Sequence, residues 1–332
     1  MKLVTYTHAA NGSLARAGLL AGSSILDLAR AVAAIDGKAA HDLATSVLGF
    51  IEHEKDLRPL AQEALAAYAH GSLPPRSDRG NVVVAAAEAK LLSPIPRPPS
   101  MRDGYAFRQH VETARRNRGL EMIPEFDQFP VFYFTNHQAV FGPGPVHVKP
   151  RHLERLDFEL ECAVVVGREG RDLSVTAADD CIFGLTIMND FSARALQMDE
   201  MKLSLGPAKG KDFATGLGPY LITTDELAQK TEKTATGNRF DLGMRAFVNG
   251  VQVSTANVKD MNWTFAQILE RASYGVTLYP GDVIGSGTCG TGCFLELNGS
   301  KITKDQWLKP GDVVALEIDE LGRLENTIVA TS

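Results

Sequence analysis

One segment of the chain, residues 156–166, alternates apolar and acidic side chains with the period of a β-strand. Apolar residues occupy every even position from Leu156 to Val166, which places Glu159 and Glu161 together on the opposite face, about 7 Å apart. Beyond Glu161 that face carries only alanine and valine, so the strand enters an interior covered on both sides. Two charges there need compensation, and we expect a divalent cation as their partner. Taken alone, the segment also fits an exposed edge with a solvated acidic face.

Two further acids stand where predicted strands meet loops. Asp190 ends a mostly apolar run, and residues 192–197 after it are typical of a short helix. Strand ends that face such turns are frequent places for functional sites. Asp103 follows a proline-rich loop at residues 93–100 and precedes His110 by seven positions, so it is a further candidate.

Length, apolar content and charge exclude several classes of protein. A chain of 332 residues with 44% hydrophobic content can form a large core and a smaller unit. Its longest apolar run, residues 82–87, is far short of the roughly 20 residues of a membrane helix, and the N-terminus lacks a signal-peptide core. We therefore expect a cytoplasmic protein without a membrane partner. The net charge of −6 argues against nucleic acid, because no basic excess is available for phosphates.

The basic cluster and the cysteines have modest interpretations. Residues 115–118 are typical of a solvated helix face, with Arg118 a candidate anion contact. Four cysteines are too few for a disulfide scaffold, and the pair at 289 and 293 has no histidine or further cysteine nearby in the sequence. We expect buried structural thiols rather than a zinc site at Cys162, Cys181, Cys289 and Cys293.

The character of the chain changes at the proline-rich loop. Before it stand a short strand at residues 2–6, the turn signal Asn11-Gly12, and alanine-rich helical patterns around 26–34 and 60–68. After it, strands and turns dominate, with a hairpin signal at Asn249-Gly250 and turns at 280–282 and 310–312. The sequence predicts an α+β protein with a small N-terminal α/β domain over residues 1–93 and a β-rich domain over 94–332 that carries the acidic site.

Residues 285–290 fit the pattern G-x-G-x-x-G, which can indicate a nicotinamide-dependent oxidoreductase. That fingerprint must open a helix, whereas residues 291–297 have the pattern of a strand that ends at the turn Asn298-Gly299. We therefore expect residues 285–290 to form a flexible loop that approaches a ligand.

Five blocks of the sequence resemble the fumarylacetoacetate hydrolase family in their order and spacing. They are DGYAFRQH at 103–110, LDFELE at 156–161, MNDFSAR at 188–194, GPAKGKDF at 206–213, and Gly287-Thr288 together with LEL at 295–297. The resemblance extends from about residue 90 to the C-terminus. It implies a catalytic domain built as a mixed β-sandwich or roll.

The resemblance also implies a metal site. The family's metal ligands fall on four acids, and two positions near a second part of the cation site fall on a lysine and a threonine: Asp103, Glu159, Glu161 and Asp190, with Lys211 and Thr215. Oxygen ligands of this kind select a hard cation, Mg²⁺ or Ca²⁺.

The catalytic histidine of the family matches His110, and the acid that orients it matches Glu296. The implied reaction is hydrolysis of a carbon–carbon bond in a 1,3-dicarbonyl compound, with His110 taking a proton from the attacking water. Oxyanion donors would be Arg194, Gln197 and Lys211. Without the resemblance, Arg194 and Gln197 fit a solvated helix face equally well.

Positions that contact substrate in the family match Tyr105 and Thr288, for which packing and turn formation are the alternatives. A family arginine falls on Gly119, with Arg118 beside it, and Met201 replaces a tyrosine of the substrate pocket. Both departures concern the tail of the substrate. Fumarylacetoacetate is therefore the first expectation and fumarylpyruvate or another acylpyruvate its rival, in the catabolism of aromatic amino acids or other aromatic compounds. The resemblance further suggests a homodimer.

Two other functions stay open. Related folds carry hydratases and decarboxylases, which would keep the metal site but would not require a His-Glu pair. The acids could also form a structural cation clamp in a binding protein, which would lose stability but no activity when metal is removed.

Overall fold

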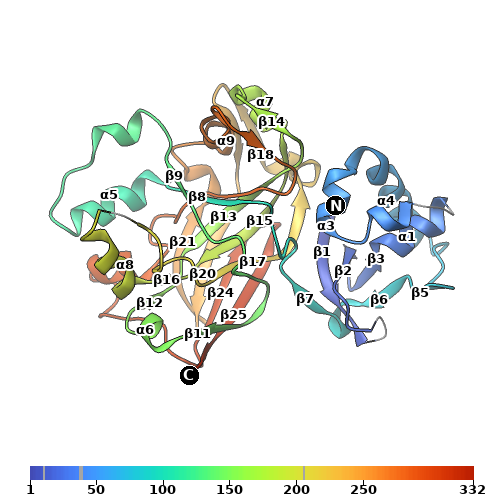
Figure 1. The fold of residues 1–332 in the computed structure, drawn as a ribbon, viewed down its shortest axis with the longest axis horizontal. Helices are drawn as coiled ribbons and strands as arrows, with labels where there is room; N and C mark the ends of the chain where they lie inside the picture. Colours follow the sequence, from blue (N-terminus) through green and yellow to red (C-terminus); the bar gives the residue numbers. More distant parts are fainter. Residues whose placement is uncertain (10–11, 37–39, 205) are drawn as a thin grey trace.

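The computed structural model describes residues 1–9, 12–36, 40–204 and 206–332, and its centre is a twelve-stranded sheet (Figure 1). The strands of this sheet are β1 (Lys2–Thr7), β2 (Arg16–Ala21), β3 (Ser24–Asp27), β6 (Val83–Ala85), β7 (Lys90–Leu92), β8 (Met101–Gly104), β9 (Phe132–Phe134), β10 (Val140–Phe141), β13 (Leu160–Val166), β15 (Ile182–Asp190), β17 (Thr215–Thr223) and β23 (Val283–Gly285). They follow the order β6-β3-β2-β1-β17-β15-β13-β23-β8-β9, while β7 pairs with β1 and β10 with β17. Strands from both parts of the chain thus form one sheet.

A second sheet of five strands packs against the large one. Its strands are β11 (Gly144–Val148), β20 (Gly243–Val248), β21 (Val251–Asn257), β24 (Val313–Ile318) and β25 (Gly322–Ala330), in the order β11-β25-β24-β20-β21. β24 and β25 contact β15, and β25 also contacts β17. Side chains of both sheets, among them Val164, Ile187 and Leu316, share one buried apolar core. The predicted β-rich sandwich is confirmed.

Four helices cover the N-terminal strands at one end of the molecule (Figure 1). They are α1 (Leu28–Asp36), α2 (Ala40–Leu43), α3 (Val47–Glu52) and α4 (Glu54–Ala69). The predicted strand at 2–6 and the helix around 60–68 are confirmed, whereas the helix around 26–34 begins only at Leu28, after β3. β1 pairs with β17, with Lys2 opposite Ile222. A domain boundary at residue 93 stays a prediction, and Asn11 of the predicted turn lies outside the described residues.

The remaining helices are α5 (Arg108–Arg116), α6 (Pro150–Leu153), α7 (Val175–Asp179), α8 (Arg194–Met201), α9 (Phe265–Ser273) and α10 (Phe294–Gly299). Short paired strands complete the fold: β4 (Arg76–Ser77) with β5 (Gly80–Asn81), β12 (Leu156–Asp157) with β16 (Ser192–Ala193), β14 (Gly170–Arg171) with β22 (Thr277–Leu278), and β18 (Thr231–Thr234) with β19 (Gly237–Phe240). Figure 1 shows α5 and α8 at the end of the molecule opposite the N-terminal helices. None of the helices in the described ranges is long and apolar enough to cross a membrane.

Three local predictions can be compared with the fold. The hairpin at Asn249-Gly250 is confirmed, because β20 and β21 pair across it and both turn residues have positive φ angles of 51° and 79°. Segment 156–166 contains two strands, β12 and β13, interrupted at Phe158 and Glu159. The helix predicted at 192–197 begins at Arg194, because residues 192–193 form β16.

The prediction of a strand over residues 291–297 is wrong, because α10 begins at Phe294. The carboxylate of Asp157 accepts hydrogen bonds from the backbone N–H groups of Phe294 and Leu295, at 2.7 and 2.9 Å. An acid 137 positions away thus fixes the start of this helix, and a local pattern could not reveal it. The helix has six residues, and the carboxylate of Asp157 already occupies its N-terminus. The helix therefore does not support a pyrophosphate site, and the oxidoreductase interpretation remains rejected.

Candidate active site

The four predicted metal-binding acids come together in the structure. Asp103 lies on β8, Glu161 on β13 and Asp190 at the end of β15, while Glu159 immediately precedes β13. One carboxylate oxygen from each lies within 4.8 Å of the others, and all four side chains are buried. We call this group the acidic cluster. The exposed acidic edge considered for Glu159 and Glu161 is excluded, since their exposures are 4% and 0%.

The loop after β23 closes one side of the acidic cluster. A Cβ atom on Gly285 would lie 2.3 Å from Asp103 Oδ1 and 3.1 Å from Glu161 Oε2, so a glycine leaves room for both carboxylates. The Gly287 N–H donates to Asp103 Oδ1 at 3.0 Å, and the Thr288 hydroxyl donates to Glu161 Oε1 at 3.3 Å. The loop predicted to approach a ligand therefore contacts two of the four acids.

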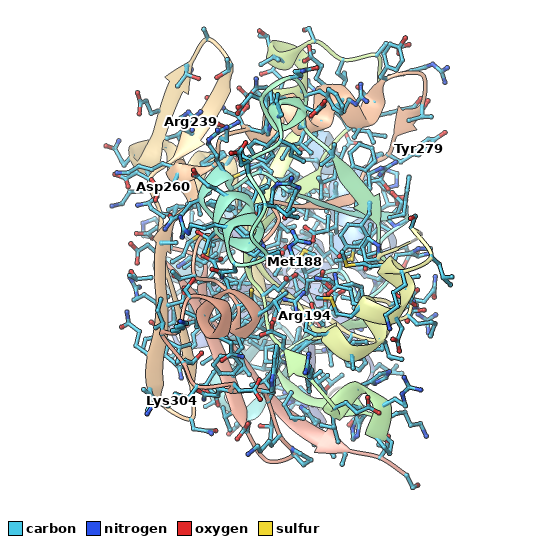
Figure 2. The ribbon with its side chains drawn as sticks, turned by 90° about the vertical axis from the view of Figure 1, so that its left-hand side faces the viewer. Met188, Arg194, Arg239, Asp260, Tyr279 and Lys304 are labelled. Atoms are coloured by element: carbon cyan, nitrogen blue, oxygen red, sulfur yellow. The ribbon has the colours of Figure 1, made fainter. Side chains whose placement is uncertain are left out.

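Two buried cations face the acidic cluster. Lys211 Nζ donates to Glu159 Oε2 and, at 2.7 Å, to Asp190 Oδ2. Arg194 NH2 donates to Glu159 Oε1 at 2.6 Å. The solvated helix face considered for Arg194 is excluded, since this residue is 3% exposed and lies among interior side chains (Figure 2). Both cations contact Glu159, so its negative charge is balanced more fully than the charges of the other three acids.

The pKa values follow this uneven distribution of charge. Burial favours a raised pKa for Glu159, but Lys211 and Arg194 outweigh it, and the pKa of Glu159 is lowered. Burial and the nearby Asp190 raise the pKa of Asp103 to about 7. Burial and Asp103 raise the pKa of Glu161 well above its usual range. Asp103 and Glu161 therefore hold protons more tightly than usual when no cation compensates these carboxylates.

The acidic cluster fits a hard divalent cation. Among the residues that the structure describes, Glu161 Oε2 and Asp190 Oδ1 are buried atoms without a hydrogen-bond partner. Unpaired buried carboxylate oxygens are costly, and a cation would satisfy both of them. The donor set consists of oxygen alone, which is the chemistry that Mg²⁺, Ca²⁺ and Mn²⁺ prefer. Lys211 cannot itself be a ligand while its ammonium is protonated; it lies beside the ligands as a neighbouring charge.

The predicted His-Glu pair is also assembled. His110 on α5 and Glu296 on α10 are buried, and His110 Nδ1 lies 2.6 Å from Glu296 Oε2. The ring of Tyr105 contacts the His110 ring edge-on, with 5.8 Å between centroids. α5 and α10 contact each other, and Asn117 at the end of α5 donates to the Glu296 carbonyl at 3.3 Å. Two helices separated by 186 positions thus bring the pair together.

The other predicted site residues take varied positions. Thr215 is buried and pairs with Asp190 across β15 and β17. Gln197 is half-buried, and its Oε1 accepts a hydrogen bond from Arg194 NH1 at 3.0 Å. Arg118 is exposed after α5 and donates to the Ala114 carbonyl. Burial raises the pKa of Tyr105, and the positive charge of Arg118 opposes this shift. Met201, at the end of α8, is 46% exposed.

Two residues of the site were not predicted. Asp157 is fully buried, and its carboxylate binds Arg194 Nε at 2.9 Å in addition to the first N–H groups of α10. It therefore connects the helix of Glu296 with the arginine that contacts Glu159. Tyr133 lies opposite Asp103 on β9, and its hydroxyl donates to Asp190 Oδ2. For Tyr133 the sequence offered only the aromatic strand pattern, and for Asp157 only its position beside Glu159.

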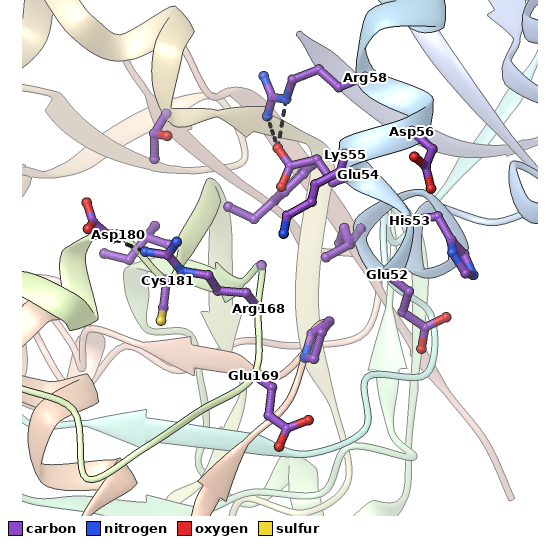
Figure 3. A pocket seen from close by; sticks show the side chains of 16 residues that line it. Glu52, His53, Glu54, Lys55, Asp56, Arg58, Arg168, Glu169, Asp180 and Cys181 are labelled. Atoms are coloured by element: carbon purple, nitrogen blue, oxygen red, sulfur yellow. Dashed lines mark hydrogen bonds and ion pairs between the residues drawn. The ribbon is translucent and has the colours of Figure 1, made fainter.

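A separate cleft of about 530 Å³ lies between the N-terminal helices and the large sheet (Figure 3). Acidic and basic side chains line it, and they include the ion pairs Arg58–Glu54 and Arg168–Asp180. None of its lining residues belongs to the acidic cluster or to the His110–Glu296 pair. Cys181 lies in this cleft, and all four cysteines are free and buried, as predicted.

Comparisons with known proteins identify the family and the fold of this chain. Residues 100–329 match the family described as fumarylacetoacetate (FAA) hydrolase C-terminal. The oxaloacetate tautomerase YisK of Bacillus subtilis (strain 168) is 29% identical over 285 residues, which cover 84% of this chain and 82% of the relative. A fumarylacetoacetate hydrolase of Exiguobacterium antarcticum has a similar fold over the full length of both chains, with a TM-score of 0.71 and 23% identity. The maleylpyruvate hydrolase of Sphingobium sp. SYK-6, solved with manganese(II) and pyruvate, gives 0.69 and 20%, also over both full chains.

Proposed function

The chain belongs to the fumarylacetoacetate hydrolase family, and from this premise we propose that it hydrolyses a carbon–carbon bond in a 1,3-dicarbonyl compound, in a metal-dependent reaction. The observation that carries the proposal is the buried His110–Glu296 pair, which Asp157 and Arg194 connect to the four buried acids. A general base next to a cation site can activate water against a substrate that the cation polarises. A structural cation clamp would have no use for the pair.

The pair is arranged for proton transfer from water. When Glu296 Oε2 accepts the proton of His110 Nδ1, the tautomer is fixed and Nε2 is left to accept a proton. Water would attack the carbonyl carbon remote from the enolisable oxygens and give its proton to Nε2. The tetrahedral oxyanion would then collapse to a carboxylic acid. The electron pair of the broken carbon–carbon bond would leave with the enolate fragment, which takes a proton to become a ketone.

Neighbouring donors can stabilise the negative charge that forms. Arg194 uses one N–H each on Nε, NH1 and NH2 for Asp157, Gln197 and Glu159, which leaves one N–H on each terminal nitrogen for a substrate oxygen. Lys211 adds a second positive charge beside the acids. A bound Mg²⁺, Ca²⁺ or Mn²⁺ would supply Lewis-acid polarisation of the enolisable oxygens. Tyr105 and Thr288 would line the substrate, with Arg118 at the outer rim.

Fumarylacetoacetate is the first substrate that we propose, with fumarylpyruvate or another acylpyruvate as the rival. The maleylpyruvate hydrolase that shares the fold supports the rival, because it was solved with pyruvate. A place in aromatic catabolism, a cytoplasmic location and a homodimer without a nucleic-acid or membrane partner belong to the same proposal. The family resemblance supports the pathway and the homodimer, and the composition supports the location and the absence of a nucleic-acid or membrane partner.

Tautomerisation of oxaloacetate is a second candidate, because YisK carries that name and aligns with most of this chain. The same His110–Glu296 pair could move a proton between the carbon and the oxygen of an enolisable 2-oxo acid. Water would not attack in that reaction, and no carbon–carbon bond would break.

One assay separates these functions. The ultraviolet absorbance of fumarylacetoacetate, fumarylpyruvate and enol-oxaloacetate is followed with Mg²⁺, with Mn²⁺ and with chelator, using Glu296→Ala as the control. Metal-dependent release of two fragments that this variant loses would support the hydrolase. Accelerated ketonisation of oxaloacetate without cleavage of the other two substrates would support the tautomerase. No turnover, together with metal-dependent stability, would favour the cation clamp.

A further inference from the structure

Cys293 places a thiol beside the His110–Glu296 pair. One potential ligand atom from each of these three residues lies within 4.8 Å of the others, and all three side chains are buried. The group offers nitrogen, sulfur and oxygen, whereas the acidic cluster offers oxygen alone. Sulfur and imidazole donors are typical of zinc sites, and a Mg²⁺ or Ca²⁺ ion has little preference for them.

We propose that His110, Cys293 and Glu296 form a second metal site, which takes a thiophilic divalent cation such as Zn²⁺ and withdraws the pair from catalysis. Binding at this site does not depend on the reaction that the protein performs. The inhibitory effect rests on the proposed function, because it requires the His110–Glu296 pair to act in turnover.

The distances allow such a site after a small rearrangement. Tetrahedral zinc has bonds of about 2.3 Å to sulfur and about 2.0 Å to nitrogen or oxygen, so its ligands lie roughly 3.3–3.5 Å apart. The thiol therefore needs to approach the pair by no more than about 1.5 Å, while His110 Nδ1 and Glu296 Oε2, which are 2.6 Å apart, need to separate by about 0.7 Å. Cys293 precedes the first residue of α10 with an extended backbone, and its side chain makes no capping hydrogen bond. Its thiol lies near the backbone N–H of Glu296, in the turn of the helix that also carries the Glu296 carboxylate.

The charges also balance. When zinc binds His110 Nδ1 and Glu296 Oε2, the proton of Nδ1 would move to Nε2, and the proton of the Cys293 thiol would be released to solvent. A thiolate, a carboxylate and a neutral imidazole around Zn²⁺ carry no net charge. Arg194, which lies near the thiol, is already balanced by Asp157 and Glu159. Burial raises the pKa of Cys293 well above its usual range, so the free thiol stays protonated and requires the metal to ionise. A water molecule can supply the fourth ligand of an open zinc site.

The test uses Cd²⁺, because a cadmium–thiolate bond gives an ultraviolet charge-transfer band and a carboxylate site gives none. The full chain is titrated with Cd²⁺ in excess Mg²⁺, and bound Cd²⁺ is then displaced with Zn²⁺. We expect one saturable band per chain, lost in Cys293→Ser and retained in Cys181→Ser, which removes a buried thiol in the separate cleft. Zinc affinity should fall at least about tenfold in Cys293→Ser. A band that persists in Cys293→Ser, or its absence from the wild-type protein, would overturn the site.

A second variant and a second measurement keep the test decisive. If Cys293→Ser does not fold, His110→Gln retains the thiol and should still weaken zinc binding at least about tenfold; unchanged affinity would contradict the site. In turnover assays with saturating Mg²⁺, Zn²⁺ should inhibit the wild-type protein, and Cys293→Ala should raise the inhibitory concentration at least about tenfold. A cadmium band without zinc inhibition would overturn the inhibitory effect alone. A cadmium band without turnover of any substrate would contradict the proposed function and leave the metal site standing.

Discussion

The acidic cluster and the His110–Glu296 pair lie in one site but are built in different ways. Three of the acids lie on β8, β13 and β15, which belong to the large sheet and are held in register by neighbouring strands. The pair lies on α5 and α10, two short helices that contact each other. The cluster is thus placed by strand pairing in the large sheet, and the pair by helix packing.

The electrostatics differ in the same direction. The acidic cluster retains unpaired carboxylate oxygens and raised pKa values, so it is incomplete without a cation. In the pair, His110 Nδ1 and Glu296 Oε2 are each other's hydrogen-bond partners, at 2.6 Å. In the proposed function, the cluster would bind the cation that polarises the substrate, and the pair would transfer protons. Asp157 and Arg194 connect the two halves.

Removal of one acid should have the largest effect. Glu161→Gln keeps the size of the side chain but removes a charge and one oxygen ligand from the cluster. Metal polarisation contributes several kcal/mol, so we expect turnover to fall about a thousandfold or more, with Mn²⁺ affinity reduced at least about tenfold. Equilibrium dialysis and steady-state assays measure the two effects. Unchanged Mn²⁺ affinity would show that the cluster is not the cation site.

Removal of the general base should lower turnover without weakening metal binding, which separates the role of the pair from that of the cluster. His110→Ala should lower kcat by about 100- to 1000-fold, because general-base assistance is lost, while Mn²⁺ affinity changes less than about twofold. The contrast with Glu161→Gln is the informative result. Equal loss of metal affinity in both variants would mean that the two halves form a single binding unit, and unchanged turnover would remove His110 from the reaction.

Asp157 tests the connection between the halves. Its two oxygens accept four hydrogen bonds, from the Phe158, Phe294 and Leu295 N–H groups and from Arg194. An amide can accept at only one of its two ends, so Asp157→Asn should loosen α10 and Arg194 together. We expect kcat to fall about 10- to 100-fold, the range typical of residues that support ligands, with little change in KM.

Asp27→Asn is the matched control for this variant. Asp27 is also fully buried and accepts hydrogen bonds from Arg16 and Tyr6, but it lies in the N-terminal part of the chain. Both variants should lower the melting temperature, whereas only Asp157→Asn should lower kcat. A similar loss of kcat in both would reduce Asp157 to a purely structural role.

The sequence predicted the acidic cluster better than its surroundings, and the reason is physical. The alternation in residues 156–166 and the strand end at Asp190 are local patterns, and the sheet that carries them is determined by the same patterns. The His110–Glu296 pair could be predicted only through the family blocks, because 186 positions separate its members. The zinc-type group was not foreseen for the same reason: Cys293 has no histidine near it in the sequence.

One wrong prediction and one alternative that the sequence left open have long-range causes. The segment at 291–297 has a strand-like pattern, but Asp157 caps α10 from a distant part of the chain. Arg194 fits a solvated helix face when its helix is considered alone, yet its partners Asp157 and Glu159 are buried on neighbouring elements. A charged residue can be placed in the interior only when its counter-charges are known, and these come from the tertiary fold.

The last prediction concerns stability and distinguishes the halves without any substrate. In the metal-free protein the pKa of Asp103 is about 7, raised by burial and Asp190 from a usual value of 3.8. Between these values the folded state holds a proton that the unfolded chain has released. The free energy of unfolding should therefore fall as pH rises from about 4 to 7, by up to about 1.4 kcal/mol per pH unit for one proton. Saturating Mg²⁺ favours the ionised carboxylates and should remove this slope.

Urea unfolding at several pH values, with Mg²⁺ and with chelator, measures this dependence of stability on pH. Glu296→Gln should retain the difference between the two conditions, because it changes the pair alone; equal slopes with and without Mg²⁺ in the wild-type protein would mean that the cation is held elsewhere.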